Sequence, residues 1–161
     1  MREDARAVRM GELAVAREDE VLAAVGLGSC IGVALFDPEA RLAGLAHVLL
    51  PEPTSGREGG PGRFASTAVP ALLEELIGAG AGRERIVAKM AGGASMFRGL
   101  SPNGEGAVGE RNAAAVRRAL EQLDIPLLGE DVGGNWGRTV YVQASDSAYI
   151  VSNVLREDVV L

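Results

Sequence analysis

The only cysteine and the only histidine of this 161-residue chain lie close together in the sequence. Cys30 ends the stretch "GLGSC", and His47 follows seventeen positions later within "GLAHVLL". A cysteine thiol becomes a nucleophile when an imidazole takes its proton, and a neighbouring imidazolium lowers the pKa of the thiol. Cys30 and His47 are therefore candidates for the nucleophile and the general base of a thiol hydrolase.

Each residue also has a structural interpretation. Free cysteine is among the most buried residue types, and a histidine within an apolar run is commonly a core residue with its hydrogen bonds satisfied. Taken singly, Cys30 and His47 both favour the core. As a pair, they leave the catalytic and the structural interpretations equally open.

Two strands are expected to position this pair. The segment after Cys30 alternates between larger and smaller side chains, which predicts a strand over 31–36, and a second apolar run predicts a strand over 42–50. If a turn at 37–41 joins them into a hairpin, Cys30 and His47 lie side by side across it.

The remaining sequence alternates between apolar segments and loops. The longest loops are expected at 51–62 and 92–106. Pro70 fits a helix if the helix begins nearer Thr67, which puts the proline in the first turn, or if the helix kinks at that point. We predict helices over 64–78 and 108–123 and further strands over 12–16, 21–25, 85–93, 126–131, 138–143 and 148–155. Roughly seven strands, dominating both ends of the chain, favour an α+β fold.

Composition limits the domain organisation and the function. The length predicts one domain over 1–161, with flexible termini at about 1–9 and 156–161. A net charge of −6 disfavours nucleic-acid partners. Neither a signal peptide nor an apolar run long enough for membrane insertion is found, and one cysteine forms no internal disulfide, so we expect a cytoplasmic protein. A single cysteine and a single histidine argue against a structural metal site.

The glycines before Cys30 do not form a nucleotide-binding loop. The third position of that fingerprint is Ile31, and the segment that follows alternates as a strand instead of opening a helix. Glycine lets another chain approach the backbone closely. We therefore expect the loop of Gly28, Ser29 and Cys30 to offer backbone N–H groups to a developing oxyanion.

Several motifs, in order, resemble the CheD family, the chemoreceptor glutamine deamidases of bacterial chemotaxis. The first are "GLGSCIGVALFDP" and "AGLAHVLLP", which contain the candidate pair. The others are "PGRFASTAV", "KMAGGASMF", "GERNAAAV" and "GEDVGGNWGRTV". Together they extend the resemblance over roughly residues 10–145.

The resemblance implies a fold, a reaction and partners. The fold is a single-domain α/β/β sandwich similar to that of toxin-type deamidases. The reaction is hydrolysis of glutamine side chains on methyl-accepting chemotaxis receptors to glutamate, through a cysteine thiolate and a thioester, together with hydrolysis of glutamyl methyl esters. No cofactor is implied. The partners are the cytoplasmic helices of chemoreceptors and a CheC-type chemotaxis phosphatase.

The resemblance also assigns site residues. The nucleophile of the family corresponds to Cys30 and its general base to His47. The third catalytic position, a threonine in the family, is Ala24 here, which has no side-chain oxygen to orient the imidazole. A backbone carbonyl, a water or a hydroxyl such as that of Thr67 or Ser29 must then take its place.

Four further residues are candidates for the wall of a substrate groove: Thr67, Gly92, Gly93 and Ser95. Asn112 and Asn135 are expected to support loops through hydrogen bonds from their side chains to the backbone. Two rival functions stay open. One is a catalytically weak or inactive binding module that docks on a CheC-type phosphatase or a receptor, which Ala24 favours. The other is a different thiol hydrolase, such as a peptidase.

Overall fold

The computed structural model describes residues 3–53, 59–95 and 107–161, and within them two five-stranded sheets and two α-helices form the fold. One sheet has the order β1 (Arg6–Ala7), β3 (Val21–Leu27), β8 (Arg138–Gln143), β9 (Ala148–Asn153) and β10 (Arg156–Val160). The other has the order β2 (Leu13–Arg17), β5 (Leu42–Val48), β4 (Ile31–Asp37), β6 (Val87–Gly92) and β7 (Leu127–Val132). The helices are α1 (Ala65–Gly78) and α2 (Val108–Gln122).

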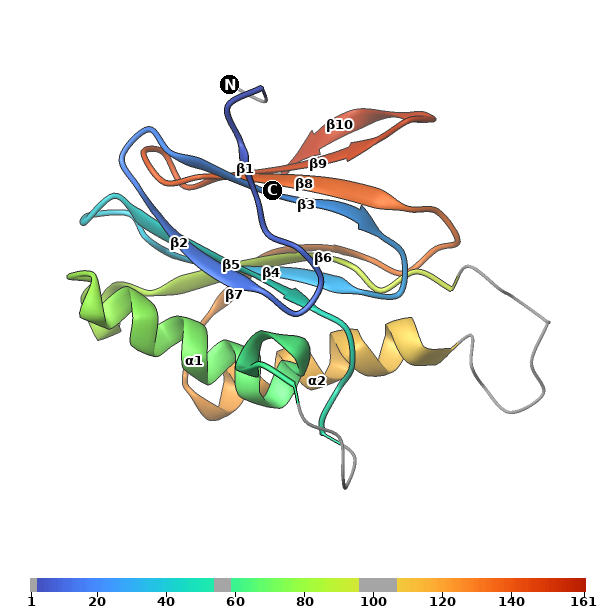
Figure 1. Cartoon of the computed structure of the whole chain (residues 1–161), viewed down its shortest axis with the longest axis horizontal. Helices are drawn as coiled ribbons and strands as arrows, with labels where there is room; N and C mark the ends of the chain where they lie inside the picture. Colours follow the sequence, from blue (N-terminus) through green and yellow to red (C-terminus); the bar gives the residue numbers. More distant parts are fainter. Residues whose placement is uncertain (1–2, 54–58, 96–106) are drawn as a thin grey trace.

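These elements stack in three layers (Figure 1). The two helices cover one face of the β2–β5–β4–β6–β7 sheet, and the β1–β3–β8–β9–β10 sheet covers its other face. One apolar core lies between the helices and the middle sheet, and a second lies between the two sheets. The α+β class and the α/β/β sandwich predicted from the sequence are confirmed.

The strand that follows the cysteine loop is central in the middle layer. All seven residues of β4 are buried, because helices cover one face and the second sheet covers the other. Ile31, Val33 and Leu35 belong to the core under the helices, whereas Ala34 and Phe36 belong to the core between the sheets. The alternation seen in the sequence therefore separates two apolar cores instead of a core and solvent.

The predicted hairpin is confirmed, with a refinement of its register. β4 and β5 pair antiparallel from Ile31 opposite Val48 to Asp37 opposite Leu42. This register places Gly32, and not Cys30, opposite His47. Cys30 precedes Gly32 by two residues and lies on the same face of the sheet.

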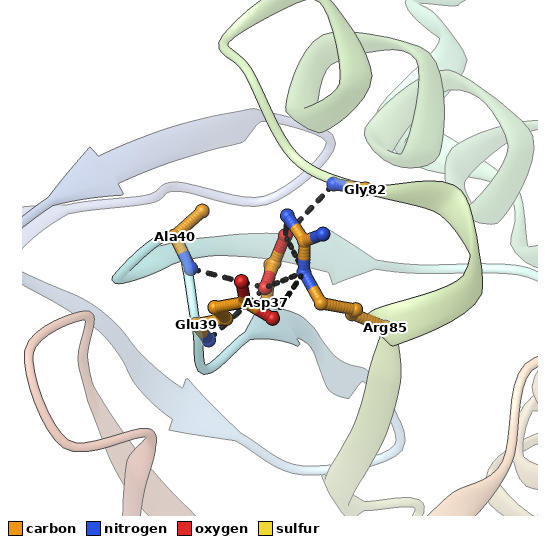
Figure 2. A network of polar contacts seen from close by, with 5 residues as sticks. All are labelled: Asp37, Glu39, Ala40, Gly82 and Arg85. Carbon is orange, nitrogen blue, oxygen red and sulfur yellow. Dashed lines mark hydrogen bonds and ion pairs between the residues drawn. The ribbon is translucent and has the colours of Figure 1, made fainter.

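A buried carboxylate fixes the turn end of this hairpin (Figure 2). The Asp37 carboxylate accepts hydrogen bonds from the backbone N–H groups of Glu39, Ala40 and Gly82, at 3.1, 3.1 and 2.8 Å. Arg85 donates to both of its oxygens, with Nη2 at 2.8 Å from Oδ2. The Arg85 guanidinium, followed by the weaker effect of the Gly82 and Ala40 N–H groups, lowers the pKa of Asp37 to about 2 despite burial. The network joins the hairpin to the segment that enters β6.

The predicted helices are present with small differences at their ends. Pro70 lies inside α1, beyond its first turn, so a helix start near Thr67, one of the two alternatives considered for this proline, is wrong. A proline there removes one N–H from the helix ladder, and the carbonyl it would have reached, on Ser66, belongs to an exposed residue. No helix in the described part of the chain is long and apolar enough to cross a membrane.

Candidate active site

Cys30 lies in the short loop between β3 and β4, one residue before β4 begins. Its thiol is free, its side chain is half-buried, and it packs against the core between the sheets. A partly exposed thiol in such a place can meet a substrate side chain that enters from the end of the sandwich.

The loop around Cys30 is fixed through its carbonyl groups. Ala94 N–H donates to the carbonyl of Gly28 at 2.8 Å, and Gly93 N–H donates to the carbonyl of Cys30 at 2.8 Å. The side-chain Nδ2 of Asn112 donates to the carbonyl of Ser29 at 2.9 Å. Three consecutive carbonyls are thus held by the segment after β6 and by α2. Among the loop and turn hydrogen bonds of the described residues, neither the Ser29 N–H nor the Cys30 N–H donates to a backbone carbonyl, so both stay candidates for an oxyanion hole.

Gly92 and Gly93 permit the contact that holds this loop. Gly92 has φ +119°, and a Cβ built on it would lie 2.1 Å from the carbonyl oxygen of Cys30. Gly93 has φ +66°, and its added Cβ would lie 2.9 Å from the carbonyl oxygen of Gly109 in α2. Both positions therefore need glycine. Their observed contacts are with the Cys30 loop (residues 28–30) and with α2.

His47 shares the inter-sheet face with Cys30. Gly32 lies opposite His47 in the ladder, and side chains two residues apart along a strand share a face. Cys30 and His47 are therefore diagonal neighbours, a relation in which Cβ atoms are roughly 7 Å apart. The residue opposite His47 is Gly32, and the space over it is filled by the side chains of Val140 and Leu27 and by the hydroxyl of Tyr149, which donates to the Gly32 carbonyl.

A backbone carbonyl orients the imidazole of His47. The ring is buried, with an exposed fraction of 2 %, and Nδ1 lies 3.0 Å from the carbonyl oxygen of Val8. Because a carbonyl only accepts, Nδ1 carries the proton and Nε2 keeps its lone pair. Nε2 has no hydrogen-bond partner among the residues that the structure describes, so it makes no hydrogen bond to the Cys30 thiol here.

The electrostatics favour a neutral pair. Burial lowers the pKa of His47, and the Val8 carbonyl and the charge of Glu12 offset this only in part. Burial raises the pKa of Cys30, against a smaller opposing effect of its own backbone N–H. Thiol and neutral imidazole are thus the favoured forms, whereas the neighbouring imidazolium considered from the sequence would have favoured the thiolate. The cause is the desolvation of both groups.

The oxygen that orients the His47 ring belongs to a backbone carbonyl, which was one of the groups considered as a substitute for a side-chain oxygen at Ala24. Ala24 is fully buried in the core between the sheets, and the Val8 carbonyl occupies Nδ1. The hydroxyl of Thr67 instead lies 2.6 Å from the carbonyl of Pro61 and 3.2 Å from that of Phe64. Neither Thr67 nor Ser29 orients the ring.

The remaining groove candidates have different positions. Thr67 lies in the first turn of α1, and its hydroxyl donates to the carbonyl of Pro61 in the turn before the helix. Ser95 N–H donates to the carbonyl of Gly134 at 2.9 Å. Ser95 and Gly93 line a depression of about 240 Å³ with Glu110 and Trp136. Ser95 and the two glycines thus lie in the segment beside the Cys30 loop. No described contact joins Thr67 to that loop. Met96 and Phe97, which end the "KMAGGASMF" motif, lie outside the described residues.

The role of Val8 was not predicted from the sequence. Its contribution is a main-chain oxygen, which leaves no trace in residue type. The same N-terminal segment also pairs with the backbone of His47: Gly11 N–H donates to the His47 carbonyl at 2.8 Å, and His47 N–H donates to the Glu12 carbonyl at 3.0 Å. Residues 8–12 thus hold the histidine in place, and no sequence motif marks this role.

Comparison with known proteins gives concordant matches. A family model described as CheD chemotactic sensory transduction matches residues 49–153. A Symbiobacterium thermophilum protein named probable chemoreceptor glutamine deamidase CheD is 46 % identical over 153 residues, 93 % of either chain. The Thermotoga maritima chemoreceptor glutamine deamidase CheD is 42 % identical over 149 residues, 92 % of either chain. Among solved structures, Bacillus licheniformis YfiH matches 74 % of this chain and 49 % of its own with TM-score 0.48 and 14 % identity.

Proposed function

The chain belongs to the CheD family, and we propose on that premise that it deamidates selected glutamines on the cytoplasmic helices of chemoreceptors to glutamate. The names of its relatives supply the reaction and the substrate. The observation that supports it in this chain is the half-buried free thiol of Cys30 on the same face as an oriented imidazole.

In the proposed mechanism Cys30 is the nucleophile and His47 the general base. Nε2 takes the thiol proton as sulfur attacks the glutamine Cδ, because the resting pair is neutral. The N–H groups of Ser29 and Cys30 stabilise the oxyanion. The imidazolium returns the proton to the nitrogen as the C–N bond breaks, which releases ammonia and leaves a thioester. His47 then activates a water, and hydrolysis yields glutamate and the free thiol. A glutamyl methyl ester follows the same route and releases methanol.

The Val8 carbonyl supports an enzyme over an inactive binding module. The argument for the module was that Ala24 leaves His47 without an orienting oxygen. The carbonyl at 3.0 Å supplies that oxygen and favours the tautomer that a general base needs. Docking on a CheC-type phosphatase is compatible with either function, and we propose it as a second, non-catalytic interaction in the cytoplasm.

A receptor cytoplasmic fragment tests the proposed activity. Incubation with the purified protein is expected to raise the mass of specific glutamine-containing peptides by about one dalton per site, since an amide becomes an acid. Peptide mapping locates the sites. No mass shift, together with tight binding to a CheC-type phosphatase, would replace the deamidase with the binding module.

A further inference from the structure

Asn112 is a fully buried polar residue in the face of α2 that packs on the middle sheet. Its neighbours on that face, Ala113, Ala115 and Val116, belong to the apolar core. A polar side chain in such a place costs free energy unless it is hydrogen-bonded. The contacts of its amide therefore explain why asparagine occupies this position.

The Asn112 amide joins the two segments that bear the candidate catalytic pair. Nδ2 donates to the carbonyl of Ser29 at 2.9 Å and to the carbonyl of Leu49 at 2.8 Å. Ser29 immediately precedes Cys30, and Leu49 follows His47 by two residues. One amide nitrogen uses both of its hydrogens, one on each segment.

This bridge lies where the ladder between the two strands ends. The last pair of the ladder is Ile31 with Val48, so the next pair in the same register would be Cys30 with Leu49. Leu49 N–H instead donates to the carbonyl of Arg63 at 2.9 Å. The Asn112 amide thus replaces the missing backbone connection between the two segments.

The other atom of the amide has no such contact. Oδ1 of Asn112 is buried and has no hydrogen-bond partner among the described residues. A buried acceptor without a partner is destabilising, so an apolar side chain would avoid this cost. An apolar side chain, however, could not donate the two hydrogen bonds that Nδ2 makes to the Ser29 and Leu49 carbonyls.

We propose that Asn112 is a positioning residue for the reaction: its amide sets the distance between the Cys30 thiol and His47 Nε2. This inference rests on the proposed function, since it assumes that the two groups react together. Asn112 touches neither the substrate nor the reacting atoms. Its effect passes through the carbonyls of Ser29 and Leu49.

The test compares Asn112→Leu, which keeps similar volume and removes both donors, with the parent protein. Misplacing the pair by a fraction of an ångström is expected to lower kcat for receptor-fragment deamidation by about 10- to 100-fold, with KM nearly unchanged. The rate of Cys30 alkylation by iodoacetamide, measured against pH, is expected to differ from that of the parent, because the Ser29 carbonyl no longer holds the loop that carries the thiol.

Asp37→Ala is the matched control, because it removes a buried network at the opposite end of β4. It is expected to lower the melting temperature and leave both kcat and the alkylation profile unchanged. If Asn112→Leu does not fold, Asn112→Ser, which is too short to reach both carbonyls, is measured in the same way.

Unchanged kcat and an unchanged alkylation profile in a folded Asn112 variant would overturn the proposal and leave Asn112 a purely structural tie. The alkylation profile needs no substrate. A parent protein without deamidase activity would therefore count against the proposed function, while Asn112→Leu would still be judged by the reactivity of Cys30.

Discussion

His47 is held by the main chain, which explains how its imidazole can be oriented although position 24 is an alanine. A threonine hydroxyl and a backbone carbonyl both offer an oxygen acceptor to Nδ1, so either can fix the tautomer. A carbonyl has no rotamer freedom, but it depends on the path of its own segment. The orientation of His47 is thus transferred from a side chain to residues 8–12.

The pH dependence of activity follows from the buried imidazole. His47 must be neutral to accept the thiol proton, and its pKa lies below the ordinary value of 6.5 because burial disfavours the charged ring. We expect kcat/KM to rise with pH through an apparent pKa below 6.5 and to be fully developed at neutral pH. An acid limb centred above 6.5 would contradict this.

The variant Val8→Pro tests whether the Val8 carbonyl affects the pKa of His47 and so the pH dependence of kcat/KM. Val8 N–H donates to the carbonyl of Ala23 at 2.7 Å and so holds the segment on β3, and proline has no N–H. Because the Val8 carbonyl raises the pKa of His47, loosening it is expected to move the acid limb to lower pH and to reduce kcat. An unmoved limb would mean that the carbonyl does not act on the imidazole.

Among the elements, those with strong periodicity could be predicted and the weakly patterned ones could not. β8 occupies the predicted residues 138–143, and the hairpin of β4 and β5 was predicted from alternation. β1 has only two residues, and all of β10 is exposed. Pairing with β3 and β9 produces these edge strands, and no local pattern in the sequence marks them.

The candidate site, like the secondary structure, could be predicted only in part. Cys30 and His47 were predicted because their residue types carry chemistry. Their diagonal relation depends on the hairpin register, which shifts with one residue of turn length. The Val8 carbonyl depends on how a distant segment crosses the sheet, and no side chain records it. The candidate pair could thus be chosen from residue types, whereas the groups that orient it could be found only from the fold.

Gly92 offers a test of the segment after β6. Gly92→Ala is expected to suffer twice, from a positive φ that costs about 1–2 kcal/mol and from a Cβ 2.1 Å from the Cys30 carbonyl. The Cys30 loop must then move, and we expect the rate of deamidation to fall by about 10-fold or more.

Gly80→Ala is the matched control for this variant. Gly80 has φ +113° and nothing within 4 Å of an added Cβ, so it carries the strain of Gly92 without the contact. Its stability should fall in urea unfolding while its rate is retained. Equal rates in the two variants would show that the contact between Gly92 and Cys30 has no effect on the reaction.

In the molecule as a whole, contacts from neighbouring elements hold both ends of the β4–β5 hairpin. At one end the Cys30 loop is held by Gly93, Ala94 and Asn112. At the other end, Asp37 fastens the turn to Arg85 (Figure 2). The first end carries the proposed chemistry, and the second contributes stability that can be measured separately.

The Asp37 network predicts a specific loss of stability in acid. The pKa of Asp37 is about 2 in the fold against 3.8 for an ordinary aspartate, so its contribution is complete above pH 3.8 and disappears as the pH falls toward 2. Allowing for screening of the partly exposed Arg85, we expect roughly 1–2 kcal/mol. Urea unfolding at pH 5 and pH 2.5 measures it. Asp37→Asn should be less stable at pH 5 and lose less on acidification, and an equal loss in both proteins would contradict this assignment.

The central claim is that Cys30 is the nucleophile of a glutamine deamidase. The most direct measurement compares the parent and Cys30→Ala on one receptor cytoplasmic fragment, by the mass of its glutamine-containing peptides over time. The account predicts a gain of about one dalton per modified glutamine with the parent and none with Cys30→Ala, at an unchanged melting temperature. A mass gain at the parent rate in Cys30→Ala would contradict it.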